Sequence, residues 1–137
     1  MCIRDSFKTD RFLAAHPFGE VPAAFGDDGA VGVFESNAIM RAAARLGPRA
    51  GELCGDGPLI QSRVDGFLDR SLIFAREVQR YLLADRERFP TDRHADMETA
   101  LASYLDGMER ALMGSRFVAC DTLSLADITF ALSLIHI

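Results

Sequence analysis

Cysteine and histidine are the side chains most able to act as nucleophile, base or metal ligand, and this chain places them singly. Cys54 and Cys120 form no CxxC pair and have no metal-ligand spacing with the histidines, so we expect two reduced thiols and no metal site. His16 and His94 stand isolated, which favours positions at the surface or at helix caps. The remaining candidates are hydroxyl and carboxylate side chains beside expected elements of secondary structure.

Ser124 and Asp127 lie three residues apart at the start of an apolar stretch. In a capping box, the serine hydroxyl accepts a hydrogen bond from the backbone N–H three residues later, and the acidic side chain accepts one from the serine N–H. Asp stands here where Glu or Gln is usual. The pair therefore predicts the first turn of a helix.

Glu35 and Ser36 follow two short apolar runs and precede an alanine-rich stretch. The runs, residues 21–25 and 30–34, are separated by the turn sequence G-D-D-G, which predicts a β-hairpin. Pro22 lies near the start of the first run, where a strand tolerates proline. We expect a helix to begin at Glu35 or Ser36 and to end at the Gly-Pro pair that follows it.

A stretch rich in glycine and proline separates this region from a different pattern. Beyond it, apolar residues recur at three- and four-residue steps in two long stretches, which predicts two amphipathic helices. Pro58 suits the first turn of the first helix, and Pro90 ends that region. Gly114 closes the second helix. The two apolar stripes are Ile60, Val64, Phe67, Leu68, Phe74, Ala75, Val78, Tyr81 and Leu82, and then Met97, Leu101, Tyr104, Leu105, Met108 and Leu112.

The first and last hexapeptides, M-C-I-R-D-S and L-S-L-I-H-I, are expected to be non-native. One DNA stretch read in opposite directions can encode both, and it resembles a transposon end used to tag DNA for sequencing. Flanks of this kind are not part of the native fold. We therefore expect non-native flanks at residues 1–6 and 132–137, an N-terminal part over 7–47, a linker over 48–57 and a helical C-terminal part over 58–131.

The composition argues against two broad classes of partner. Apolar residues make up 49% of the chain and charged residues 26%, as in ordinary globular proteins. The net charge of −5 and the absence of basic runs argue against binding to nucleic acid. No apolar stretch approaches the ~20 residues that span a membrane. We expect a cytoplasmic protein with no nucleic-acid or membrane partner.

Four elements, in order along the chain, resemble the glutathione S-transferase superfamily. They are P-F-G-E-V-P-A at residues 17–23, F-E-S-N-A-I at 34–39, the Gly/Pro linker, and S-L-A-D-I at 124–128. The combination V-P-A-x-F, D-D-G and V-F-E-S-N-A-I is similar to the transferase-like domain of the gamma subunit of eukaryotic translation elongation factor 1, and to theta-like and bacterial transferases. The resemblance implies an α/β, thioredoxin-like N-terminal part and an all-α C-terminal helical domain, both incomplete.

The resemblance also implies a glutathione site. Pro22 matches the family's cis proline, which would leave the Val21 backbone to pair with the cysteinyl part of glutathione. Glu35 and Ser36 match the pair that holds the γ-glutamyl end, with Ser36 as a carboxylate site at a helix N-terminus and Glu35 as the partner of the ammonium. A plain strand-start proline and a plain helix cap are the alternative interpretations of Pro22 and Ser36. Glu20 departs from the family, which often has Lys or Gln there, and would repel the glycyl carboxylate unless it points to water.

Two functions follow from the resemblance. In the first, the parent protein is a glutathione transferase, working as a homodimer, that uses glutathione as co-substrate and attaches its thiol to a small electrophile. In the second, it is a non-catalytic interaction domain of an elongation factor 1 gamma-type subunit. The family's thiol-activating Tyr, Ser or Cys would lie before Phe7, so no catalytic residue is assigned and we expect this chain alone to be inactive.

Overall fold

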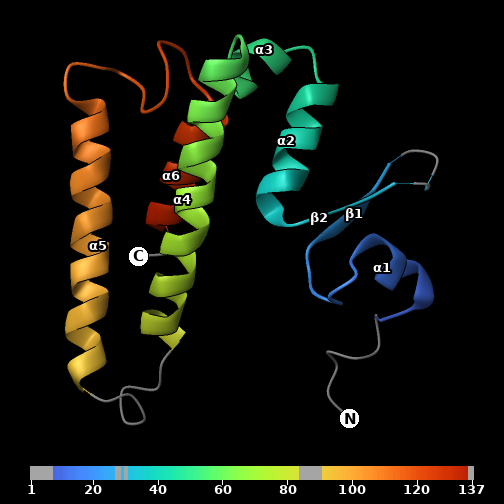
Figure 1. Cartoon of the computed structure of the whole chain (residues 1–137), viewed down its shortest axis with the longest axis horizontal. Coiled ribbons are helices and arrows are strands. Elements are labelled where there is room, and N and C mark those ends of the chain that lie inside the picture. The colour runs from blue at the N-terminus through green and yellow to red at the C-terminus, as the bar shows by residue number, and fades with distance from the viewer. Residues whose placement is uncertain (1–7, 27–28, 30, 84–90, 136–137) are drawn as a thin grey trace. The chain divides into compact units, whose positions relative to one another are not determined.

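The computed structural model describes residues 8–26, 29, 31–83 and 91–135; at residues 77–83, 91–94 and 135 it describes the backbone only. The chain divides into two compact units, Met1–Pro48 and Arg49–Ile137 (Figure 1). The first unit carries the strands, and the second consists of helices and their connections. This is the expected pairing of an α/β, thioredoxin-like N-terminal part with a helical C-terminal domain.

The first unit contains α1 (Asp10–Ala15), β1 (Ala23–Phe25), β2 (Gly32–Phe34) and α2 (Ser36–Leu46). The two strands pair antiparallel, with Ala24 opposite Val33, so the predicted hairpin is present. Helix α1 begins after Thr9, whose hydroxyl accepts a hydrogen bond from the backbone N–H of Phe12 at 3.2 Å. The pattern of residues 7–13 is typical of the end of a helix or of a loop, whereas the structure has a complete short helix over Asp10–Ala15.

The end of α1 lies directly against β2. A Cβ atom added to Gly32 would stand 2.3 Å from the Cα of Ala15, so glycine is the residue that allows this approach. His16 follows as the C-cap of α1, and its ring centroid lies 4.8 Å from that of Phe34. The histidine ring is buried, so the expectation of a surface position was wrong for this residue, although the cap position was right. The side chain of His94 lies outside the described residues.

The second unit contains α3 (Ala50–Cys54), α4 (Pro58–Leu83), α5 (Thr91–Leu112) and α6 (Leu125–Ile135). Helix α3 lies within the stretch expected to be a linker. Arg49 precedes it and forms a two-pronged ion pair with Glu52, with the Nε to Oε2 distance at 2.7 Å.

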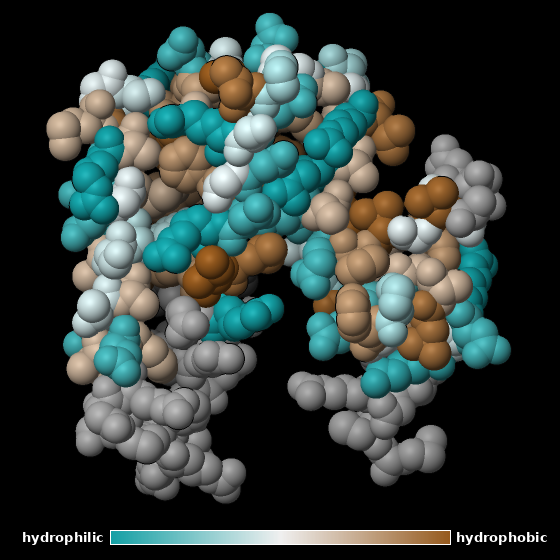
Figure 2. Space-filling view, in the orientation of Figure 1, coloured by the Kyte–Doolittle hydropathy of each residue, from teal (hydrophilic) through white to brown (hydrophobic). Residues whose placement is uncertain are grey.

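Helix α4 packs against both α5 and α6 and forms the core of this unit. Val64 and Leu68 have no exposed surface, and Phe74 stacks on Tyr104 of α5 with ring centroids 3.9 Å apart. These residues belong to the predicted apolar stripes, which the structure confirms at these positions; the side chains of Val78, Tyr81 and Leu82 lie outside its description. Hydrophilic side chains form a band across the face of this unit shown in Figure 2, as amphipathic helices require.

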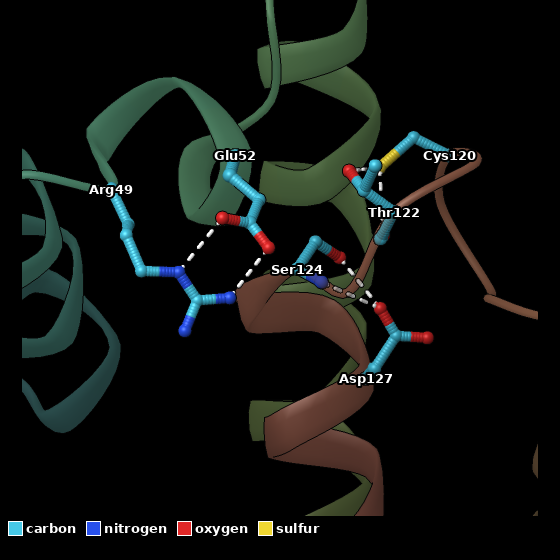
Figure 3. Close-up of polar contacts among 6 residues, drawn as sticks. All are labelled: Arg49, Glu52, Cys120, Thr122, Ser124 and Asp127. Carbon is cyan, nitrogen blue, oxygen red and sulfur yellow. Dashed lines mark hydrogen bonds and ion pairs between the residues drawn. The ribbon is translucent and has the colours of Figure 1, made fainter.

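Helix α6 begins directly after Ser124, as the capping motif predicts (Figure 3). Oδ2 of Asp127 accepts a hydrogen bond from the Ser124 backbone N–H at 2.9 Å. The other half of the predicted box was wrong: the serine hydroxyl donates to the same carboxylate oxygen at 2.8 Å. Oδ1 of Asp127 accepts a third bond, from the backbone N–H of Val118 at 2.8 Å. The helix continues to Ile135, four residues into the terminal hexapeptide expected to be non-native.

Candidate functional site

The register of the hairpin brings the two sequence motifs of the candidate site together. Ala23, the first residue of β1, pairs with Phe34, the last residue of β2. Pro22 immediately precedes Ala23, and Glu35 immediately follows Phe34. The antiparallel pairing therefore places the Val-Pro pair and the Glu-Ser pair at the same end of the hairpin, within the first unit.

Val21 is connected to Pro22 by a cis peptide bond, as the family resemblance implies. The residue lies before β1 and outside its ladder. No hydrogen bond joins the Val21 backbone to another residue in the described part of the chain. Its side chain is 68% exposed. Val21 therefore offers a free backbone donor and acceptor in an exposed segment.

Glu35 is the N-cap of α2 and has an unusual backbone conformation. Its φ is 68° and its ψ is 130°, and among the described residues other than glycine it alone has a positive φ. A residue with a Cβ atom pays roughly 1–3 kcal/mol for such a conformation, and strained residues of this kind concentrate at functional sites. Its side chain makes no capping hydrogen bond and is exposed.

Ser36 is the first residue of α2, one position after the cap. Its hydroxyl has no hydrogen-bond partner among the residues described. The interpretation of Ser36 as a plain N-cap is therefore wrong, because Glu35 holds that position. The hydroxyl stays exposed beside the helix start, where a small ligand can reach it.

The first turn of α2 adds a partial positive charge to this end of the hairpin. The first hydrogen bond of the helix runs from the Ile39 N–H to the Glu35 carbonyl at 3.0 Å. Backbone N–H groups before Ile39 therefore precede the repeating hydrogen bonds of the helix. The first turn of α2 contains no acidic side chain. Such a helix start favours an anionic group.

Together these groups could hold a small peptide-like molecule. The Val21 backbone can pair with an amide, Ser36 and the start of α2 can hold a carboxylate, and the Glu35 carboxylate can hold an ammonium group. Glu20, which could repel a second carboxylate, has an exposed side chain and is free to turn towards water.

One feature of this site has no signature in the sequence. A positive φ is common at glycine and at asparagine, and nothing in the type or spacing of Glu35 announces it. Its position before a helix indicated only a cap. Glu35 is the single residue between the end of β2 at Phe34 and the start of α2 at Ser36.

The part of the chain that the structure describes contains neither a candidate metal site nor a candidate membrane span. No three His, Cys, Asp or Glu side chains lie close enough there to hold a metal ion. The helices there are also too short or too polar to span a lipid bilayer. Cys54 is buried and Cys120 partly buried, both as free thiols.

Comparison with known proteins gives relatives in sequence and in structure. Glutathione S-transferase F9 of Arabidopsis thaliana is 31% identical over 134 residues, covering 92% of this chain and 61% of that protein. Elongation factor 1-gamma 3 of Oryza sativa subsp. japonica is 41% identical over 66 residues, covering 48% of this chain and 15% of that protein. No protein-family model matches the chain.

Among solved structures, glutathione S-transferase 1-6 from Anopheles dirus species B has the same fold. The TM-score is 0.77 at 20% identity, with 99% of this chain and 64% of that chain covered. The chain spans about three fifths of the length of both transferases.

Proposed function

Because the chain belongs to the glutathione S-transferase superfamily, we propose that it binds glutathione through Val21, Pro22, Glu35 and Ser36, and that the whole protein transfers the glutathione thiol to small electrophiles. The observation that carries this proposal is the register of the hairpin, in which the pairing of Ala23 with Phe34 gathers all four residues at one end.

The chemistry of glutathione fits the groups at that end. The molecule is a tripeptide that is about 10 Å long when extended, with two carboxylates, an ammonium group and a thiol. The free backbone of Val21 can bind the central cysteinyl residue as an added strand does. The γ-glutamyl carboxylate then lies at Ser36 and the start of α2, and its ammonium group lies at Glu35.

Transfer of the thiol needs one more group. A cysteine thiol has a pKa near 8.5, so a hydrogen-bond donor or a positive charge must stabilise the thiolate at neutral pH. None of the four binding residues is assigned this role, and the family resemblance expects it ahead of Phe7. We propose that the whole protein is a cytoplasmic homodimer, with glutathione as co-substrate and no metal.

A second candidate function is a non-catalytic interaction domain of an elongation factor 1 gamma-type subunit. The similarity to the rice elongation factor over 66 residues supports it. The two functions differ in whether the whole protein conjugates glutathione to a model aryl halide. Steady conjugation by the full-length protein supports the transferase, and binding without turnover supports the interaction domain.

Glutathione binding is tested on the chain itself by saturation-transfer NMR, which detects weak binding. We expect signals from the γ-glutamyl and cysteinyl protons. Ser36→Ala should weaken binding about tenfold, because it removes a hydrogen bond to a charged group. Ser103→Ala is the matched control, since Ser103 is an exposed serine on α5.

Two outcomes contradict the proposed site. In one, glutathione gives no saturation transfer at millimolar concentration. In the other, the Ser36→Ala and Ser103→Ala chains bind it equally well.

A further inference from the structure

The second unit contains a cavity that is independent of the proposed glutathione site. Its volume is about 860 Å³, and its walls come from α3, the start of α4, the end of α5 and the connection that follows α5. Small-molecule sites commonly have volumes of roughly 300–1,000 Å³. Every residue that lines this cavity belongs to the second unit.

Much of the cavity wall is apolar. Ile60 of α4 and Ala111 of α5 contribute from opposite helices, and Phe117, Val118 and Ala119 contribute from the connection. Val118 and Ala119 are themselves buried, and the hydrogen bond from Val118 to Asp127 fixes this segment against α6. The wall is therefore held in place before a ligand arrives, which lowers the entropy cost of binding one.

The carboxylates at the cavity are not equivalent. Glu52 is neutralised by its ion pair with Arg49. Asp56 and Asp121 also line the cavity, and neither has a hydrogen-bond or ion-pair partner among the described residues. Both side chains are exposed, so they present two negative charges, neither of which is in an ion pair.

The one cationic side chain in the described lining is already engaged. Nη2 of Arg63 donates to the Val118 carbonyl at 3.5 Å, and its Cζ lies 5.7 Å from the centroid of the Phe67 ring. The start of α4 adds a partial positive charge, which Asp56, just before that helix, offsets. Apart from Glu52, which is paired with Arg49, the described lining carries two carboxylates and one guanidinium, so its net charge is −1.

We propose that this cavity binds an amphipathic organic cation. The apolar body of the ligand lies against Ile60 and Phe117, and its positively charged group faces Asp56 and Asp121. Charge complementarity and a preformed apolar wall support this site, which is separate from the proposed glutathione site in the first unit.

The test uses rhodamine 6G, a cationic dye with a large apolar body, and follows its fluorescence anisotropy with the whole chain. Asp56→Asn and Asp121→Asn should each weaken binding about two- to fivefold, the effect of losing one exposed charge pair. Raising the salt concentration to 1 M should weaken it further, since the charges are exposed. Asp106→Asn makes the same change in net charge at an exposed position outside the cavity and should leave binding unchanged.

Cys120 gives a second readout that locates the dye. Its thiol lines the cavity, and it donates a hydrogen bond to the Thr122 carbonyl at 3.3 Å (Figure 3). Bound rhodamine 6G should slow the alkylation of Cys120 by iodoacetamide, as measured by peptide mass spectrometry, and should leave the buried Cys54 unaffected.

Three results would overturn the proposal. The first is equal weakening by Asp106→Asn and by the cavity variants, which indicates attraction to net charge alone. The second is unchanged alkylation of Cys120 at saturating dye. The third is stronger protection of Cys120 by the anionic dye 1-anilinonaphthalene-8-sulfonate than by rhodamine 6G.

Discussion

Asp127 holds Ser124 through two hydrogen bonds to one carboxylate oxygen, from the backbone N–H at 2.9 Å and from the hydroxyl at 2.8 Å. The other oxygen accepts the backbone N–H of Val118 at 2.8 Å. Val118 and Ser124 are both almost fully buried. One side chain thus fixes the start of α6 and the chain segment that leads towards it.

Asp127→Ala should lower the free energy of unfolding of the second unit by about 3 kcal/mol, because it leaves buried N–H groups without an acceptor. Asp127→Asn should lower it less, since one acceptor oxygen remains. Urea unfolding followed by circular dichroism measures both. Asp106→Ala is the control at an exposed position. Equal midpoints for Asp127→Ala and the control would show that the carboxylate does not stabilise the fold.

Gly32→Ala should destabilise the first unit by about 3 kcal/mol, because its Cβ would stand 2.3 Å from the Cα of Ala15, and a backbone atom cannot move aside cheaply. Hydrogen exchange measured by mass spectrometry should show lost protection over residues 10–15, 23–25 and 32–34. Gly66→Ala is the matched control, since nothing lies within 4 Å of its added Cβ in α4. That control should be stabilised by about 0.5–1 kcal/mol through its helix propensity. Unchanged protection in Gly32→Ala would contradict the close approach of α1 to β2.

Local pattern predicted most of the fold. Helices α4 and α5 repeat their apolar residues over several turns, and the hairpin is marked by a turn sequence between two apolar runs. Helix α1 escaped prediction because six residues give too short a pattern to separate a helix from a loop. Its only clear signal was Thr9 at the cap.

Features that depend on distant contacts could not be predicted in the same way. The bond from Val118 to Asp127 joins a loop to a helix, and nothing in the spacing of the two residues indicates it. The direction of the Ser124 hydroxyl depends on that same carboxylate. At the candidate site, the residues were identified by resemblance, but the positive φ of Glu35 required the backbone.

Tyr104 makes the stability of the second unit sensitive to alkaline pH. Burial raises the pKa of its phenol above the usual value of 10, and the positive charge of Arg70 opposes this shift to a smaller extent. The folded state therefore holds the phenolic proton more tightly than the unfolded state does. Its contribution to stability is complete below pH 10 and is lost as the pH rises through the folded-state pKa.

The free energy of unfolding should accordingly fall as the pH rises above 10, and Tyr104→Phe should reduce that fall. Urea unfolding at a series of pH values measures both chains. Stacking on Phe74 is kept in the variant, so stability near pH 8 should change little. Parallel pH profiles for the two chains would rule out a raised pKa for Tyr104.

Substitutions at Glu35 can distinguish the stability of the first unit from its proposed binding of glutathione. Glycine adopts a positive φ without steric cost, so Glu35→Gly should relieve the strain at φ 68° and raise the free energy of unfolding by about 1 kcal/mol. The same change removes the carboxylate proposed to hold the ammonium group, and glutathione binding should weaken about tenfold. Glu35→Gln keeps the backbone strain and removes only the charge, so it should weaken binding without adding stability. Urea unfolding and saturation-transfer NMR measure the two effects. A gain in stability from glycine with no loss of binding would show that the conformation serves the turn from β2 into α2 and not the ligand.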